Sequence, residues 1–282
     1  MRQSVLLHGH RIAFVDLAGS GIPLVLVHGV GSSLETWGDV PQRLAASGRR
    51  VIAVDLIGHG ESGLGNGDFS LGANASMIRD LLDHLGVERV HLVGHSLGGG
   101  VSMQFLYQFP DRVDTLTLVS SGGLGPDVAA TLRAATLPGS STVIKLASKS
   151  GFVNTASWVG RTLKAVGKDV DALSPRAMSR LRALNDDGRS AAFLATLRSV
   201  VGPMGQTVYA MDKLQSVEPE RVLVIWGAED PTLPVQHAWD THEQLPGSRV
   251  VIVPGAHHHP HSDDPDRFVR VLIEHVGVNA HT

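Results

Sequence analysis

Short apolar runs alternate along the chain with longer stretches of helical spacing. Eight of the runs are typical of β-strands: Ser4–Leu7, Arg11–Leu17, Pro23–Val27, Arg50–Asp55, Arg89–Val93, Val113–Val119, Arg221–Trp226 and Arg249–Val253. Several contain a continuous apolar stretch, such as Leu24-Val25-Leu26-Val27 and Val222-Leu223-Val224-Ile225, as burial on both faces of a sheet requires. From Pro23 onward helical stretches separate them: Leu34–Ala46, Ala73–Leu85, Leu97–Phe109, Val235–Leu245 and Pro265–Val276. This alternation predicts an α/β protein with a mostly parallel eight-stranded sheet and helices on both faces.

The alternation stops between residues 125 and 218. This stretch contains helix-like patches but no convincing strand, and turn pairs such as Pro138-Gly139 and Gly202-Pro203 divide it. We therefore expect a core domain of residues 1–124 and 219–282, with an inserted helical cap of residues 125–218. Most apolar residues of the cap should pack against the sheet and the others should line a pocket; they are Leu132, Leu137, Ile144, Leu146, Phe152, Trp158, Leu163, Phe193, Leu194 and Leu197.

Composition narrows the functional classes. The 282 residues are 43% hydrophobic and 18% charged, with a net charge of −3 and no block of like charges, which argues against nucleic-acid binding. The absence of cysteine excludes disulfides, thiolate metal sites and a cysteine nucleophile. The apolar runs are too short for a signal peptide or a membrane span, so we expect a cytoplasmic protein without membrane insertion. The oligomeric state stays open, a homodimer included.

Gly94-His95-Ser96-Leu97-Gly98 is the most informative motif of the chain. This G-x-S-x-G pattern follows an apolar strand and precedes a helical stretch, which is the context in which a serine is exposed on a tight strand-to-helix turn. The flanking glycines fit such a turn because a side chain there would collide with it. We interpret Ser96 as a nucleophile, with the backbone N–H of Leu97 as one donor to a developing oxyanion.

A serine nucleophile needs a base and an orienting carboxylate, and two later loops supply both. Asp230 follows the strand that ends at Trp226, and His257-His258-His259 follow the strand that ends at Val253. In a doubly wound sheet such loops meet at the carboxyl ends of the strands. The order Ser, Asp, His is that of one known triad class. A turn or helix-capping role is the alternative for Asp230.

These segments resemble the α/β-hydrolase fold family, and the resemblance covers nearly the whole chain outside the insertion. It rests on His28-Gly29-Val30-Gly31, Asp55–Ser62, the Ser96 motif, Trp226–Asp230 and Pro254–Phe268. The family's closing pattern, P-G-x-G-H-x-x-x-x-[ED]-x-P-x-x-F, places the catalytic histidine at His258 and the acidic position at Asp263. His257 replaces the glycine that normally precedes this histidine. The resemblance also implies Val30 as the second oxyanion donor.

Other histidines have alternative interpretations. A metal site at His257, His258, His259 and His261 is disfavoured, because consecutive residues point in different directions and no carboxylate stands at ligand spacing. We expect His261 to be a solvated or rim residue and His28 to be structural. His95 fits a packing role or a place at the pocket edge.

The resemblance implies a serine hydrolase with no cofactor and no metal, acting on an apolar small molecule with an ester, thioester or lactone bond. Serine in place of aspartate argues against epoxide hydrolases and haloalkane dehalogenases. The alternative is a carbon–carbon bond hydrolase acting on ring-fission products, which Gly122-Gly123 and the cap favour and His259, in place of the usual tryptophan, disfavours. Atypical chemistry on the same triad, and a non-catalytic binding protein of the same fold, are further alternatives.

Overall fold

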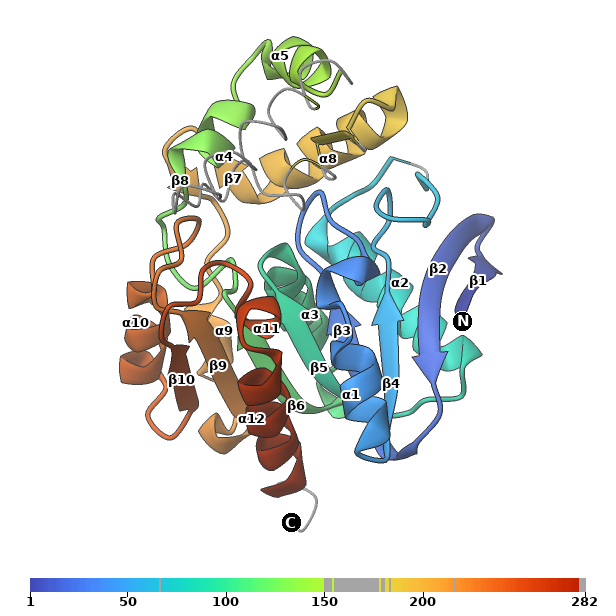
Figure 1. Cartoon of the computed structure of the whole chain (residues 1–282), viewed down its shortest axis with the longest axis vertical. Coiled ribbons are helices and arrows are strands. Elements are labelled where there is room, and N and C mark those ends of the chain that lie inside the picture. The colour runs from blue at the N-terminus through green and yellow to red at the C-terminus, as the bar shows by residue number, and fades with distance from the viewer. Residues whose placement is uncertain are drawn as a thin grey trace.

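The computed structural model describes residues 1–65, 67–149, 154, 178, 181–182, 184–215 and 217–278. Its main sheet has eight strands in the order β1-β2-β4-β3-β5-β6-β9-β10 (Figure 1). The strands are β1 (Arg2–Leu7), β2 (His10–Leu17), β3 (Ser20–Val27), β4 (Arg49–Val54), β5 (Val90–His95), β6 (Val113–Val119), β9 (Val222–Gly227) and β10 (Arg249–Val253). β2 pairs antiparallel with β1 and β4, and all other neighbours are parallel. The predicted α/β fold with a mostly parallel eight-stranded sheet is confirmed.

The sheet carries an apolar core on each face, because successive residues of a strand point to opposite sides. Leu24 and Leu26 of β3 belong to the core under α1 (Val40–Ala46) and α12 (Pro265–Val278). Val25 and Val27 belong to the other core, under α2 (Leu71–His84) and α3 (Leu97–Gln108). Figure 1 shows α1 and α12 in front of the sheet. The continuous apolar runs of the sequence therefore reflect burial on both faces.

Shorter elements connect these layers. They are the 3-10 turns η1 (Leu34–Trp37), η2 (Pro110–Arg112) and η4 (Pro219–Arg221) and the helices α9 (Met211–Leu214), α10 (Gln236–Gln244) and α11 (Pro260–Asp263). The single helix predicted over Leu34–Ala46 is wrong: η1 and α1 are separate, because Gly38 between them has a φ of 56°, outside helical geometry. Among the described residues, no helix is both long and apolar enough to cross a lipid bilayer.

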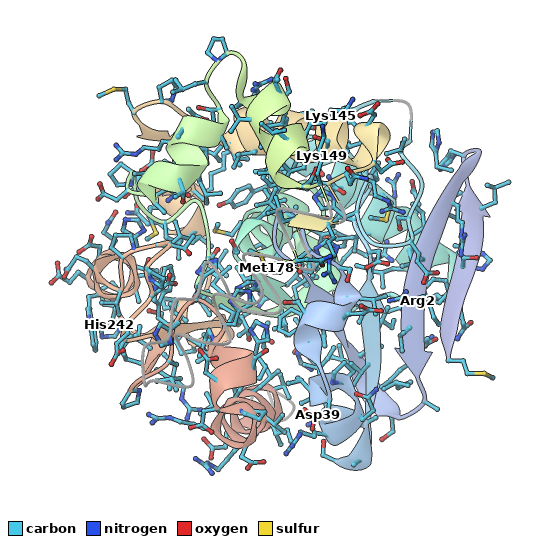
Figure 2. The ribbon with its side chains drawn as sticks, turned by 45° about the horizontal axis from the view of Figure 1, so that its top comes forward. Arg2, Asp39, Lys145, Lys149, Met178 and His242 are labelled. Carbon is cyan, nitrogen blue, oxygen red and sulfur yellow. The ribbon has the colours of Figure 1, made fainter. Side chains whose placement is uncertain are left out.

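The inserted segment lies over the carboxyl ends of the parallel strands (Figure 1). Its described elements include α4 (Ala130–Ala135), α5 (Ser140–Ala147), α8 (Asp187–Val200) and a hairpin of β7 (Val201–Gly202) and β8 (Gly205–Gln206). The expectation of no strand in this segment is corrected by that hairpin, whose two-residue strands are too short to show a periodic pattern. Lys145 Nζ lies 2.7 Å from Asp187 Oδ1 and so links α5 to α8. Figure 2 shows where Lys145 lies on the inserted segment.

The apolar residues of the insertion divide into two groups. Leu194 and Leu197 of α8 are buried, as expected for the face toward the sheet. Leu137 and Leu146 are 45% and 62% exposed and are not among the cavity-lining residues, so they have neither of the two expected roles. Leu146 lies on α5, which is farther from the sheet than α8 (Figure 1), and Leu137 lies between α4 and α5. Phe152, Trp158 and Leu163 lie outside the described residues.

Several buried histidines make the stability of this fold dependent on pH. His59, in the loop after β4, donates its Nδ1–H to the carbonyl oxygen of Ile57 at 2.9 Å, and its ring centroid lies 5.5 Å from that of His28. Burial, followed by the neighbouring His28, lowers the pKa of His59 to about 4. Between pH 6.5 and 4 the unfolded chain therefore binds a proton at His59 that the folded chain does not.

We predict that the free energy of unfolding decreases as pH falls from 6.5 to 4, with about 3 kcal/mol of the decrease due to His59. His59→Asn should reduce the slope in this interval, because asparagine keeps a donor near Ile57 and does not titrate. Denaturant unfolding at several pH values measures the slope. His84→Asn, at an exposed position, is the control and should leave it unchanged. Equal slopes in the wild type and His59→Asn would contradict the prediction.

Candidate active site

Ser96 stands on a strained turn between β5 and α3. Its φ of 55° and ψ of −119° lie in a region that costs a non-glycine residue about 1–3 kcal/mol. The Ser96 N–H donates to the carbonyl oxygen of Val119 on β6 at 3.0 Å, and the Ser96 carbonyl accepts from Gly99 and Gly122, each at 3.0 Å. These three backbone bonds hold the turn against its strain.

The glycines of the motif are required by close contact. A Cβ on Gly98 would lie 2.2 Å from the carbonyl oxygen of Val27, and a Cβ on Gly94 would lie 2.3 Å from the carbonyl oxygen of Gly98. A Cβ on Gly29 would lie 3.0 Å from Ser96 Cβ. The loop after β3 is therefore packed directly against Ser96, as the sequence predicted for the loop that contains Val30.

Asp230 and His258 form a hydrogen-bonded pair. His258 Nδ1 lies 2.8 Å from Asp230 Oδ2, and the two side chains are 8% and 0% exposed. Asp230 Oδ1 accepts the backbone N–H groups of Thr232 and Leu233 at 2.8 and 3.0 Å. The turn role considered for Asp230 is thus also present: one carboxylate oxygen closes the turn and the other binds the imidazole. A proton on Nδ1 for this bond leaves the Nε2 lone pair as a base.

The loops that carry this pair are pressed together. A Cβ on Gly227, at the end of β9, would lie 1.9 Å from the carbonyl oxygen of His257. The Glu229 N–H donates to the Ala256 carbonyl at 2.9 Å, and the His257 N–H donates to Asp263 Oδ2 at 2.8 Å. Asp263, the acidic position of the closing pattern, therefore helps to shape the turn in which histidine replaces the usual glycine.

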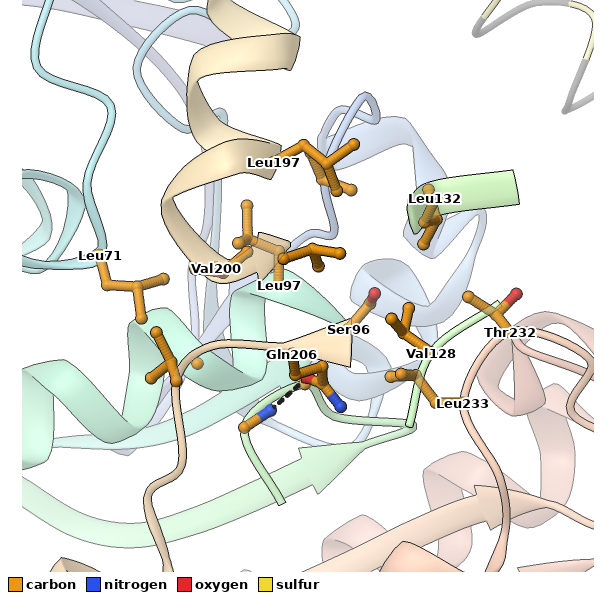
Figure 3. A pocket seen from close by; sticks show the side chains of 16 residues that line it. Leu71, Ser96, Leu97, Val128, Leu132, Leu197, Val200, Gln206, Thr232 and Leu233 are labelled. Carbon is orange, nitrogen blue, oxygen red and sulfur yellow. Dashed lines mark hydrogen bonds between the residues drawn. The ribbon is translucent and has the colours of Figure 1, made fainter. Parts of the chain in front are cut away.

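A cavity of about 500 Å³, its open mouth included, has Ser96 in its wall. The core side of the wall is formed by Val30, Leu71, Ser96, Leu97, Gly100, Gly122, Gly123, Thr232 and Leu233. The inserted segment contributes Val128, Leu132, Leu197, Val200, Val201, Gln206 and Val208. Figure 3 shows the Ser96 hydroxyl among these apolar side chains. Val30 and Leu97, the predicted oxyanion donors, line the same cavity as Ser96, and no charged side chain is among its described lining residues.

Gln206 is a lining residue that the sequence did not single out. Its Oε1 accepts the Gly123 N–H at 2.8 Å, the bond dashed in Figure 3. Its Nε2 donates to the carbonyl oxygens of Gly125 and Asp127 at 2.7 and 3.0 Å. The side chain thus joins the β7–β8 hairpin to the loop after β6. In the sequence, only the pair Gly122-Gly123 indicated that the loop after β6 was of interest. Gln206 could not be predicted, because its position depends on a hairpin whose two-residue strands have no sequence pattern.

The oxyanion-side loop is supported by buried polar groups. His28 donates its Nδ1–H to the Gly29 carbonyl at 2.8 Å and accepts the Leu56 N–H on Nε2 at 3.1 Å, which fits its predicted structural role. Asp55 is fully buried and accepts the N–H groups of Leu34 and Glu61 at 2.7 and 2.8 Å. Burial raises the pKa of this carboxyl, although its two N–H bonds act in the opposite direction.

The histidines of the last loop have different environments. The side chain of His257 is 46% exposed and lies 3.9 Å from Glu229. His261 is fully buried, with its ring 4.6 Å from that of Trp37 and 5.9 Å from that of Phe268, so the expectation of a solvated or rim residue is wrong. The short helix α11 turns it inward, which sequence spacing alone did not indicate. Among the described residues, no group of three or more potential ligands is arranged to hold a metal ion.

Comparison with known proteins agrees with this architecture. The alpha/beta hydrolase fold family matches residues 22–265. This chain belongs to that family. An uncharacterized protein of Mycobacterium tuberculosis is 43% identical over 270 residues, which cover 94% of this chain and 78% of that protein.

Solved structures of family members share the fold. A thermophilic esterase of Thermogutta terrifontis superposes with a TM-score of 0.74 at 24% identity and full coverage of both chains. A meta-cleavage product hydrolase of Pseudomonas fluorescens IP01 superposes with the same TM-score at 23% identity, covering 98% of this chain and 97% of the other. At these identities the likeness establishes the fold. Because one of these proteins is an esterase and the other a meta-cleavage product hydrolase, the fold alone does not specify the reaction.

Proposed function

We propose that this protein is a serine hydrolase that cleaves an ester, thioester or lactone of an uncharged, apolar small molecule through an acyl-enzyme on Ser96. The observation that carries the proposal is the strained Ser96 turn in the wall of an apolar cavity, on the same sheet edge as the hydrogen-bonded Asp230–His258 pair. A strained turn of this kind persists only where the surrounding structure enforces it, and functional sites are where such turns cluster.

The reaction follows from the roles of these groups. His258 Nε2 takes the proton of Ser96 Oγ as this oxygen attacks the substrate carbonyl carbon. The carbonyl oxygen becomes an oxyanion and accepts the backbone N–H groups of Val30 and Leu97. Asp230 stabilises the imidazolium, which then protonates the leaving alcohol or thiol as the carbon–oxygen or carbon–sulfur bond breaks. Water, deprotonated by His258, attacks the acyl-enzyme and releases the carboxylic acid and Ser96.

We further propose that residues 125–218 act as the cap of this site. They contribute Leu132, Leu197 and Val200 to the cavity wall. An apolar wall opposite the nucleophile excludes water and favours substrates with hydrocarbon groups.

The lining argues against the carbon–carbon alternative. Ring fission of an aromatic diol leaves a carboxylate on the product, and burying a carboxylate without a partner costs several kcal/mol. The described lining has no cation to pair with it. Two cations of the inserted segment are engaged elsewhere: Lys145 pairs with Asp187, and Arg189 donates to the carbonyl of Gly60. Loss of a triad member would favour a non-catalytic binding protein, and Ser96, His258 and Asp230 are all present.

Ser96→Ala should leave the protein folded and reduce turnover of p-nitrophenyl butyrate by roughly 10⁴- to 10⁶-fold. His258→Ala should be nearly as damaging, because the same imidazole serves both half-reactions. The matched controls are Ser102→Ala, a buried serine on α3, and His257→Ala, both of which should keep turnover within a few-fold. Steady-state kinetics measures the effects and circular dichroism verifies folding. More than a tenth of the wild-type activity in Ser96→Ala would refute the proposal.

The cavity should select the acyl chain by its length. Each buried methylene contributes about 0.8 kcal/mol, or about four-fold in kcat/KM, until the cavity is full. Leu197→Ala should move the optimum to longer acyl chains by enlarging the cavity, and kcat/KM from acetyl to decanoyl esters measures the shift. Leu194→Ala, a buried leucine of the same helix outside the lining, should leave the optimum unchanged. A flat profile in every variant would mean that this cavity does not hold the acyl group.

Phe193 is not a suitable position for enlarging the cavity, although its sequence position suggested it. Phe193 is not among the lining residues, and its ring carbons would lie 3.0 and 3.1 Å from a Cβ on Gly31. It packs against the loop after β3 instead. The other aromatic candidate, Trp158, lies outside the described residues.

The protein should discriminate against charged acyl groups. We expect kcat/KM for p-nitrophenyl hexanoate to exceed that for the matching half-ester of a dicarboxylic acid by at least about 100-fold, because the second substrate must bury an unpaired carboxylate. The two substrates differ in the terminal group of the acyl chain and share the leaving group, so any difference arises in the acyl site. Equal rates, or a preference for the charged ester, would restore the carbon–carbon alternative.

A further inference from the structure

His95 is a buried imidazole for which the proposed reaction has no step. It is the last residue of β5 and directly precedes Ser96. The residue is 2% exposed, and burial, followed by the neighbouring imidazoles of His259, His261 and His258, lowers its pKa well below the ordinary value. The ring therefore stays neutral at physiological pH, with a proton on only one of its two nitrogens.

The hydrogen bond of His95 identifies the protonated nitrogen. His95 Nε2 lies 2.7 Å from the carbonyl oxygen of His258, and a carbonyl only accepts, so the proton is on Nε2. His95 Nδ1 is buried and has no hydrogen-bond partner. A Cβ on Gly29 would lie 3.2 Å from this Nδ1. The His95 ring thus lies between the loop after β3 and the backbone of His258.

The same ring is the packing surface for the loop that carries His258. The centroid of His95 lies 4.9, 4.7 and 4.8 Å from those of His258, His259 and His261, respectively. His258 is therefore held at two points from two different strands. Its Nδ1 binds Asp230 after β9, and its carbonyl oxygen binds His95 at the end of β5.

Packing alone does not account for a histidine at this position. A buried polar atom without a partner destabilises the folded state, and Nδ1 of His95 is such an atom. A leucine of similar volume would fill the space without that cost. The feature that only the histidine provides here is the Nε2–H donor to His258.

We propose that His95 is a positioning residue, which fixes the backbone of His258 so that its imidazole stays aligned with Ser96 while remaining bonded to Asp230. The inference rests on the proposed roles of Ser96 and His258. Without the Nε2–H donor, the loop from His257 to His261 gains freedom, and a displacement of about 1 Å between base and nucleophile reduces turnover by about 100-fold.

Three substitutions of His95 and a matched control test this inference. His95→Leu removes the donor and keeps the volume, and it should reduce kcat by about 10- to 100-fold with KM changed less than about two-fold. His95→Gln, whose amide nitrogen can occupy the place of Nε2, should restore most of kcat. The asparagine of His95→Asn is polar but too short to reach His258, so this variant should behave like His95→Leu. It therefore provides the same test if His95→Leu does not fold. The control is His91→Leu, which removes another buried histidine of β5, bonded to Thr115, and should not change kcat.

A spectroscopic readout separates positioning from general destabilisation. The Nδ1–H of His258, bonded to the Asp230 carboxylate, should give a low-field proton resonance in NMR that His258→Gln removes. We expect this resonance in the wild type, His95→Gln and His91→Leu, and its loss or shift in His95→Leu and His95→Asn. An unchanged resonance, or a kcat within two-fold of wild type, in folded His95→Leu or His95→Asn would overturn the inference.

The two proposals fail in different ways. If the wild type hydrolyses no ester, the proposed function fails, and the response of the resonance to His95→Leu still decides whether His95 positions His258. If Ser96→Ala abolishes turnover and His95→Leu does not reduce it, the proposed function stands and the role of His95 is refuted.

Discussion

The positive φ of Ser96 is the constraint on which the rest of the site depends. The turn between β5 and α3 is so tight that neither flanking glycine admits a Cβ: one on Gly98 would meet Val27 of β3, and one on Gly94 would meet the backbone of Gly98. The backbone bonds of Ser96 to Val119, Gly99 and Gly122 balance a strain of about 1–3 kcal/mol. In this conformation the serine side chain faces the cavity, whereas in the helix it would lie among the packed layers. The order of the sheet then places the loops after β3 and β9 around the same point.

The second structural requirement is that loops following different strands are held in fixed positions relative to one another. Asp230 is held by its own turn, and His258 is held by Asp230 through its side chain and by His95 through its backbone. The turn of Asp230 is local, but the two contacts of His258 join loops and strands from different parts of the sequence, so the geometry depends on the whole sheet. The inserted segment adds an apolar wall to this arrangement, and this wall is the basis of the preference for uncharged acyl groups that we propose.

Much of this architecture could be predicted from the sequence. The strands are detectable because burial on both faces gives continuous apolar runs such as Leu24–Val27, and the Ser96 turn is detectable because its glycines are sterically required. His258 and Asp230 were predicted from their positions after two strands and from the closing pattern, and the structure joins them by a hydrogen bond. The closing contact between Ser96 Oγ and His258 Nε2 remains a prediction.

Other features have no local signal. The burial of His261 depends on where α11 packs, and the role of Gln206 depends on a hairpin of two-residue strands. The exposure of Leu137 and Leu146 was not predicted, because helical spacing shows that one face of a helix is apolar but does not show whether another element covers that face. The contact of His95 with the carbonyl of His258 joins residues 163 positions apart, so only the folded chain reveals it.

The central claim is that Ser96 is activated for attack on a carbonyl, and covalent labelling tests it most directly. The folded protein would be treated with a fluorophosphonate, which reacts with activated serine hydroxyls, and the adduct located by peptide mass spectrometry. The account predicts one adduct per chain, on Ser96, with labelling slowed by orders of magnitude in His258→Ala and unaffected in His257→Ala. No adduct on the folded wild type, or an adduct on another serine that forms equally fast in His258→Ala, would contradict it.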